Sequence, residues 1–135
     1  MRRIPYILIV TLVCVCLLSG CAGGGPSSSA LPGYTQISQR EALEMMESTK
    51  DCIILDVRRE DEFAQGHIPG AVLLPNESID GGDIAGLPDK EQVILVYCRS
   101  GNRSRQAAEK LAEMGYVNVY EFGGINTWPG EITTE

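Results

Sequence analysis

The chain has 135 residues, with 11 Lys and Arg against 18 Asp and Glu, so its formal net charge is −7. A chain of this length is expected to form one domain. The acidic balance argues against nucleic-acid binding and against docking on anionic membranes through basic patches.

The N-terminal segment has the pattern of a secretory signal. Arg2 and Arg3 form a positive start, and residues 4–18 are almost wholly apolar. An apolar run of about fifteen residues is short for a membrane span, which needs roughly twenty. We therefore expect residues 1–20 to be a signal peptide.

The segment ends in Leu18-Ser19-Gly20-Cys21, which resembles the lipobox of bacterial lipoproteins. The resemblance implies cleavage before Cys21, diacylglycerol on its sulfur and acylation of the new amino terminus. An uncleaved anchor is the alternative. Loss of Arg2 and Arg3 would change the net charge from −7 to −9, so lipid would have to hold the protein on a membrane. The expected location is the bacterial cell envelope, on the extracytoplasmic side.

A composition change marks the start of the folded domain. Residues 21–33 are rich in Gly, Ser and Pro, which is typical of a flexible tether. We expect the folded domain to occupy residues 34–133, about 100 residues, which is enough for one hydrophobic core.

Within that domain, apolar patterns predict strands that alternate with helices. Ser38 to Glu41 has the form of a capping box, which predicts a helix over the residues that follow. Further along the chain we expect strands at 53–57, 72–74, 91–97 and 117–122. We expect a short helix within 59–65, a helix after residue 98 that ends at Gly115, and a last turn over 125–128. The expected connections are a turn at 67–71, a loop at 76–90 with a helical turn near 84–87, and a break at Gly123-Gly124. Such alternation predicts a parallel sheet covered on both faces, with the functional site at the carboxyl ends of its strands.

Cys98 is the strongest candidate for a catalytic residue. It lies where a buried strand ends and a helix is about to begin, and it is followed by Arg99-Ser100-Gly101-Asn102-Arg103-Ser104. Unpaired N–H groups and the helix dipole favour anions at such a place, and Arg99, Arg103 and Arg105 add positive charge. These features predict a nucleophilic thiolate in an anion cradle, acting on a small anionic substrate.

The remaining cysteines predict neither a disulfide nor a metal site. Cys14 and Cys16 lie in the signal segment, whereas Cys52 begins its own apolar run. If the strands of Cys52 and Cys98 are parallel neighbours, the two sulfurs are roughly 16 Å apart, too far for a disulfide. His67 is the single histidine, so no cysteine–histidine cluster has metal-ligand spacing, and no metal or cofactor is expected.

Several blocks of the chain closely resemble the single-domain rhodanese family. They occur in the family's order and are Leu55-Asp56-Val57-Arg58, Glu62-Phe63, Gly66-His67-Ile68-Pro69-Gly70-Ala71, residues 96–104 around Cys98, and Phe122-Gly123-Gly124 to Trp128. The resemblance implies an α/β, three-layer rhodanese-like fold with a five-stranded parallel sheet flanked by helices. It also implies sulfur transfer through a persulfide on Cys98, from thiosulfate or a similar small anionic donor to a thiol or cyanide acceptor.

The chemistry expected of the loop assigns roles to its members. The amides of about Arg99, Ser100, Gly101, Asn102 and Arg103 would surround the sulfur, and the Arg99 and Arg103 side chains would bind the donor's sulfonate. Gly101 would supply a backbone conformation closed to residues with a Cβ.

Four residues outside the loop are expected to support it. Asp56 and Arg58 are expected to form an ion pair that supports the loop more than they act in chemistry. His67 is expected to be structural more than a general base, and Gly123 is expected to allow close approach to the cradle.

Two other functions fit the same fold. Phosphatases of this fold place five residues between nucleophile and arginine, whereas four separate Cys98 from Arg103, a shorter loop that suits one sulfur better than a phosphate. A docking module without chemistry is the other alternative, although inactive relatives typically lose the cysteine that this chain keeps.

Overall fold

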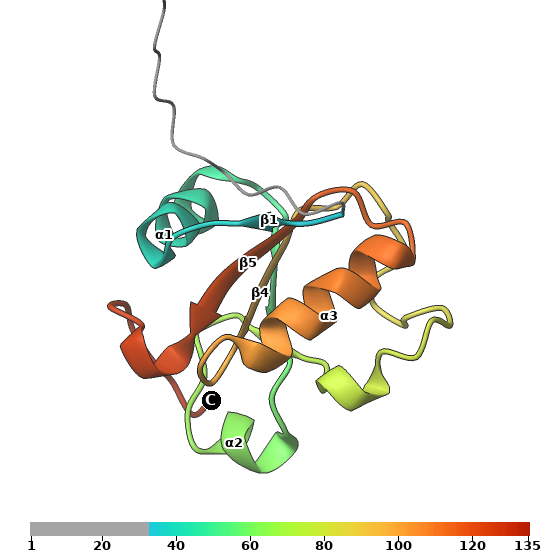
Figure 1. Cartoon of the computed structure of the whole chain (residues 1–135). Helices are drawn as coiled ribbons and strands as arrows, with labels where there is room; N and C mark the ends of the chain where they lie inside the picture. Colours follow the sequence, from blue (N-terminus) through green and yellow to red (C-terminus); the bar gives the residue numbers. More distant parts are fainter. Residues whose placement is uncertain (1–32) are drawn as a thin grey trace, which may run out of the picture.

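The computed structural model describes residues 33–135, which form one α/β unit (Figure 1). The expected signal peptide, Cys21 and nearly all of the tether lie outside the described residues, and they remain predictions. Between residues 33 and 135, no helix has the length and apolar character needed to cross a bilayer. The elements in chain order are β1 (Thr35–Gln36), α1 (Gln39–Ser48), β2 (Ile53–Asp56), α2 (Glu60–Ala64), β3 (Val72–Leu73), the 3₁₀ turn η1 (Asn76–Ser78), β4 (Ile94–Cys98), α3 (Asn102–Glu113), β5 (Val119–Gly124) and the 3₁₀ turn η2 (Ile125–Thr127).

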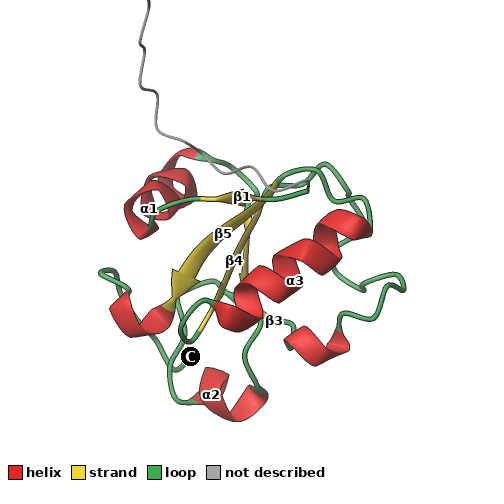
Figure 2. Ribbon diagram, viewed as in Figure 1, coloured by secondary structure: helices red, strands yellow, loops and turns green. Residues whose placement is uncertain are grey.

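The sheet has five parallel strands in the order β1-β5-β4-β2-β3, as expected for the fold (Figure 2). Strand β4 is central, and all five of its residues are buried. This explains its uninterrupted apolar sequence, because a strand covered on both faces has no polar side. Strands β2 and β4 are parallel neighbours, with Ile53 opposite Ile94, which meets the condition under which Cys52 and Cys98 are too far apart for a disulfide.

The fold has three layers, a central sheet with helices on each face, and a hydrophobic cluster lies on each face of the sheet. One lies on the face covered by α3 and the 74–87 segment, and it contains Cys98 together with Leu111 and Ile79. The other lies on the opposite face, where Ala42 of α1 packs with Tyr97 and Phe122. Figure 1 shows α3 crossing the front of β4 and β5, with its N-terminal end near the carboxyl ends of the strands. This arrangement brings the loop between β4 and α3 to the edge where the functional site was expected.

Local signals account for the ends of the main helices. Ser38 and Glu41 form the predicted capping box at the start of α1, with each side chain bound to the other residue's backbone N–H. Gly115, which follows α3, has φ +91°, the left-handed conformation expected of a glycine after a helix.

Several boundaries differ from the prediction. Strand β4 begins at Ile94, three residues later than expected, and it includes Cys98. Strand β5 does not break at Gly123-Gly124 but continues through both, because Gly124 pairs with Cys98 across a register shift. The expected helical turn near residue 84 is a single non-helical turn, in which the Leu87 N–H donates to the Ile84 carbonyl at 3.1 Å. The residue pattern also missed η1 and the two-residue strand β1.

Candidate active site

Cys98 is the last residue of β4, and its side chain is 1% exposed. The chain turns directly after it and enters α3 at Asn102. Gly101 makes this turn possible with φ +105°, a conformation that residues with a Cβ rarely adopt. The turn aims the Gly101 N–H at the Cys98 Sγ, at a distance of 3.0 Å.

The surroundings of Cys98 favour its ionised form. Burial alone would raise the pKa of the thiol. Hydrogen bonds from the Ser104 side chain and from the N–H groups of Ser104, Gly101 and Ser100 outweigh it, so the pKa lies below the ordinary cysteine value. A sulfur with a lowered pKa beside a helix start is a chemically competent nucleophile.

The loop lies directly against the end of β5. A Cβ on Gly124 would come within 2.2 Å of the Arg99 carbonyl oxygen, so only glycine fits there. A Cβ on Gly123 would meet nothing nearer than 3.9 Å. The expectation that Gly123 permits the close approach is therefore wrong in position. Gly124 permits the approach, and Gly123 instead supplies a turn with φ +90°.

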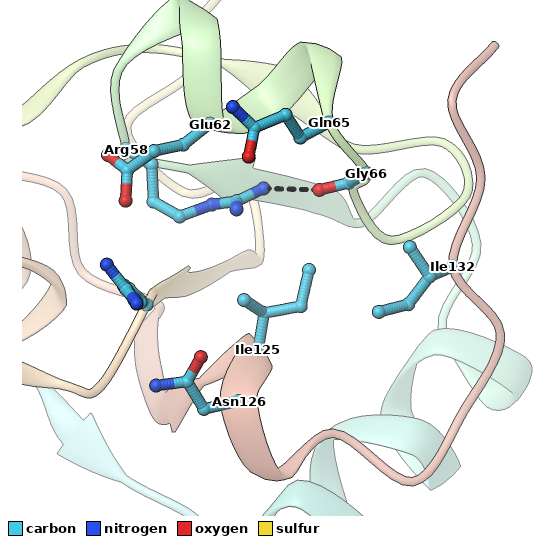
Figure 3. A pocket seen from close by; sticks show the side chains of 8 residues that line it. Arg58, Glu62, Gln65, Gly66, Ile125, Asn126 and Ile132 are labelled. Atoms are coloured by element: carbon cyan, nitrogen blue, oxygen red, sulfur yellow. Dashed lines mark hydrogen bonds between the residues drawn. The ribbon is translucent and has the colours of Figure 1, made fainter.

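A pocket of about 340 Å³ opens beside the loop (Figure 3). Arg99 contributes to its wall and is exposed. Within residues 33–135, no carboxylate forms an ion pair with Arg99, so its guanidinium is available to an anion. The remaining lining residues are Arg58, Glu62, Gln65, Gly66, Ile125, Asn126 and Ile132.

Arg103 has a different environment from the one expected. Its two terminal nitrogens donate to the Glu62 carboxylate of α2 at 2.6 and 2.8 Å. This hydrogen bond, opposed by burial, lowers the pKa of Glu62 to about 2. The expectation that the Arg103 side chain binds a donor's sulfonate is therefore not supported, because its guanidinium already forms an ion pair with Glu62.

The other loop residues differ in exposure. Ser100 is exposed, and its backbone N–H favours the Cys98 thiolate. Asn102 is exposed too, and its side-chain oxygen accepts a hydrogen bond from Arg105 at 2.6 Å. The cradle around the sulfur therefore consists of backbone groups and Ser104, and the Asn102 side chain faces Arg105 instead.

Asp56 and Arg58 form a buried ion pair at the end of β2. The closest approach is 2.6 Å, between Arg58 Nη2 and Asp56 Oδ2. The same Nη2 donates to the Gly66 carbonyl at 2.7 Å, the contact drawn as a dashed line in Figure 3. The pair thereby joins the end of β2 to the segment after α2, in agreement with a supporting role.

His67 is buried and held between two parts of the chain. Its ring stacks on Phe63 with centroids 3.7 Å apart. Its Nδ1 lies 3.0 Å from the Phe63 carbonyl, and its Nε2 lies 3.0 Å from the main-chain oxygen of Glu135. His67 also pairs with Thr133 through the backbone, which brings Ile132 to the pocket. These contacts favour the structural role over that of a general base.

Three residues of the site were not predicted from the sequence to belong to it: Glu62, Ser104 and Glu121. Glu62 and Ser104 lie in the blocks that resemble the rhodanese family, but neither was given a role. Glu121 is a buried acid on β5, two residues after the core residue Val119. An acid at a core-facing position of a strand is a detectable signal, because alternate residues of a strand face the same side.

The described residues include two cysteines. Cys52 and Cys98 are both free thiols. Over residues 33–135, no group of three His, Cys, Asp or Glu side chains is placed to hold a metal ion.

Comparison with known proteins assigns this fold and loop to a family. The family model described as "Rhodanese-like domain" matches residues 38–131. The chain belongs to the rhodanese-like domain family. It is 38% identical over 102 residues to the thiosulfate sulfurtransferase GlpE of Coxiella burnetii, an alignment that covers 75% of this chain and 92% of that protein.

Further similarities are to a second thiosulfate sulfurtransferase and to solved rhodanese structures. The chain is 38% identical over 71 residues to the thiosulfate sulfurtransferase PspE of Escherichia coli, which covers 53% of this chain and 68% of that protein. Among solved structures, a rhodanese with anions from E. coli superposes with a TM-score of 0.56 at 34% identity, covering 62% of this chain and 98% of that one. A rhodanese-like domain protein from Staphylococcus aureus superposes with a TM-score of 0.63 at 28% identity, covering 74% and 97%.

Proposed function

We propose that the protein is a sulfurtransferase that carries sulfur as a persulfide on Cys98. The observation that carries the proposal is the cradle itself, in which the Gly101 N–H donates to the Cys98 sulfur at 3.0 Å and the thiol pKa is lowered. The relatives named thiosulfate sulfurtransferase support the same reaction class.

The reaction has two displacement steps. The Cys98 thiolate attacks the outer sulfur of thiosulfate, a new S–S bond forms, and sulfite leaves with the electron pair of the broken S–S bond. An acceptor thiolate or cyanide then attacks the outer sulfur of the persulfide, and Cys98 leaves as a thiolate. Backbone N–H groups disperse the negative charge in both steps, so neither step draws on a metal or a cofactor.

Arg99 is proposed as the residue that binds the donor's sulfonate. It lines the pocket beside the loop, it follows Cys98 directly, and its guanidinium forms no ion pair with the other described residues. Arginine binds such oxyanions with paired N–H groups. The other charged lining residues already have partners, because Arg58 pairs with Asp56 and Glu62 pairs with Arg103. Among the described lining residues, Arg99 is therefore the unpaired charge that would orient the donor.

The reaction class can be tested with two substrates. Purified protein is incubated with thiosulfate and cyanide, and separately with an aryl phosphate. We expect thiocyanate formation that Cys98→Ser abolishes, and no phosphate release. Phosphate release without thiocyanate would replace the proposal with a phosphatase, and neither product would favour a docking module.

We further propose that Cys21 is lipidated and holds the domain on the extracytoplasmic side of a membrane. The support is the basic, apolar and Leu18-Ser19-Gly20-Cys21 order of the N-terminal sequence. Metabolic labelling with palmitate tests it in a bacterial host. The wild-type chain should take up label and sediment with membranes, whereas Cys21→Ala should do neither; equal labelling of both chains would contradict the proposal.

A further inference from the structure

Glu121 is a buried acid, and the Ser104 side chain lies between its carboxylate and the Cys98 sulfur. The residue is 3% exposed. Its Oε1 accepts hydrogen bonds from the Ser104 hydroxyl at 2.6 Å and from the Gly123 N–H at 2.8 Å, and its Oε2 accepts one from Gln36 at 3.1 Å. A buried carboxylate is costly to desolvate, and these three donors offset that cost.

Ser104 connects this carboxylate to the sulfur. Its hydroxyl is fully buried in α3 and lies 3.4 Å from the Cys98 Sγ. It also lies 3.0 Å from the Gly101 carbonyl and 3.3 Å from that of Gly123. A hydroxyl has a single proton to donate, so it cannot serve all of these acceptors at once.

The shortest contact identifies the acceptor that holds this proton. At 2.6 Å, the bond to Glu121 has the length of a charge-assisted O–H···O bond. While Ser104 donates to Glu121, it presents a lone pair to the Cys98 thiol and accepts the thiol's proton, so the Ser104 hydroxyl lowers the pKa of Cys98 only once its own proton has left Glu121. A Cys98 thiolate needs the opposite orientation, with the Ser104 proton turned toward the sulfur.

We propose that Glu121 is a positioning residue, which competes with Cys98 for the Ser104 proton and so governs how readily the sulfur becomes a nucleophile. The inference rests on the proposed function and concerns the regulation of the same site. When Cys98 ionises, its proton passes to the solvent and the Ser104 hydroxyl turns from the carboxylate to the thiolate. The buried site then has two anionic acceptors and one hydroxyl proton between them.

Other charged groups surround this set without replacing Ser104. On the side of Glu121, Tyr34 precedes β1 and lies within electrostatic reach of Glu121 and of Arg105 and Glu109 of α3. On the side of Cys98, Arg103 is held by Glu62, and Arg99 lines the pocket. Within residues 33–135, no cation lies within ion-pair distance of Glu121, so the bond to Ser104 is its direct connection to the site.

The test measures the ionisation of Cys98 in the full-length protein without any sulfur donor. The rate of iodoacetamide alkylation at Cys98 is followed against pH by mass spectrometry of its peptide, for wild type, Glu121→Gln, Ser104→Ala and the double variant. Glu121→Gln should lower the midpoint by about one pH unit, because the charge is lost and the Ser104 proton is free for the thiolate. The shift should be much smaller in the Ser104→Ala background.

A second variant, at Gln36, tests the inference even if Glu121→Gln does not fold. Gln36 is exposed, and its side chain donates to Glu121 without a hydrogen bond to Cys98 or Ser104. Gln36→Met removes that donor and makes the carboxylate a stronger competitor, so the midpoint should move up, opposite to Glu121→Gln. An unmoved midpoint in both variants, or an equal Glu121→Gln shift with and without Ser104, would overturn the inference. Because no donor is used, the titration is independent of whether thiosulfate yields a persulfide.

Discussion

Arg103 and Glu62 are joined by two parallel hydrogen bonds of 2.6 and 2.8 Å, although they lie 41 positions apart in the sequence. The pair connects the first turn of α3 to α2 and so braces the loop that carries Cys98. It also changes the expected roles of the two loop arginines, because Arg103 is neutralised by a partner while Arg99 is not. The positive charge available to a substrate in this loop is therefore that of Arg99.

Removing the charge of Arg99 should weaken donor binding. We expect Arg99→Gln to raise the KM for thiosulfate about tenfold, the effect of losing a charge-assisted hydrogen bond of about 1.5 kcal/mol. Arg105→Gln is the matched control, because Arg105 is exposed nearby on α3 and bonded to Asn102. Steady-state kinetics with varied thiosulfate measures the effect. A KM that rises equally in both variants would assign it to general positive charge.

The Glu62–Arg103 pair should make stability depend on pH in the acid range. The pKa of Glu62 is lowered to about 2 in the folded protein by its hydrogen bond with Arg103, against about 4.3 in an unfolded chain. The unfolded chain therefore binds the proton first. The stabilisation is fully present above about pH 5 and is lost as the pH falls toward 2.

Urea unfolding of wild type and Glu62→Gln over that range measures the pH dependence. The free energy of unfolding should fall more steeply with acid in the wild type. Glu60→Gln, at an exposed site on the same helix, should behave like the wild type. Parallel curves for wild type and Glu62→Gln would contradict the role of the pair.

The two glycines at the end of β5 should respond differently to alanine. Gly124→Ala places a Cβ against the Arg99 backbone, so we expect a loss of about 2–3 kcal/mol in the free energy of unfolding and a displaced Cys98 loop. Gly123→Ala has space but φ +90°, which costs roughly 1–2 kcal/mol. Chemical denaturation and a sulfur-transfer assay measure both effects. Gly81→Ala, at φ +94° with no atom within 4 Å, is the control for strain alone.

Much of the fold could be predicted because its signals are local. The apolar run before Cys98, the capping box at Ser38 and Gly115 after α3 each specify an element from adjacent residues. The boundaries of β5 could not be found in this way. Gly123-Gly124 resembles a break by composition, yet Gly124 belongs to the strand because it pairs with Cys98.

The site was predictable where chemistry lies within the loop and not where it depends on packing. Cys98 and Gly101 could be predicted because the apolar strand before them and the helix after them are adjacent in the sequence. The partner of Arg103 lies in α2, and the acid near Ser104 lies on β5, so both contacts require the folded arrangement. His67 likewise finds a contact 68 residues away, at Glu135. Spacing along the chain contains no information about such contacts.

Intact-protein mass spectrometry shows directly whether Cys98 carries the transferred sulfur. The full-length protein is treated with thiosulfate, freed of excess reagent and compared with Cys98→Ser and Cys52→Ser variants. We expect a gain of one sulfur atom in the wild type and in Cys52→Ser, lost on addition of cyanide, and no gain in Cys98→Ser. Absence of the adduct from wild type, or its persistence in Cys98→Ser, would contradict sulfur transfer through Cys98.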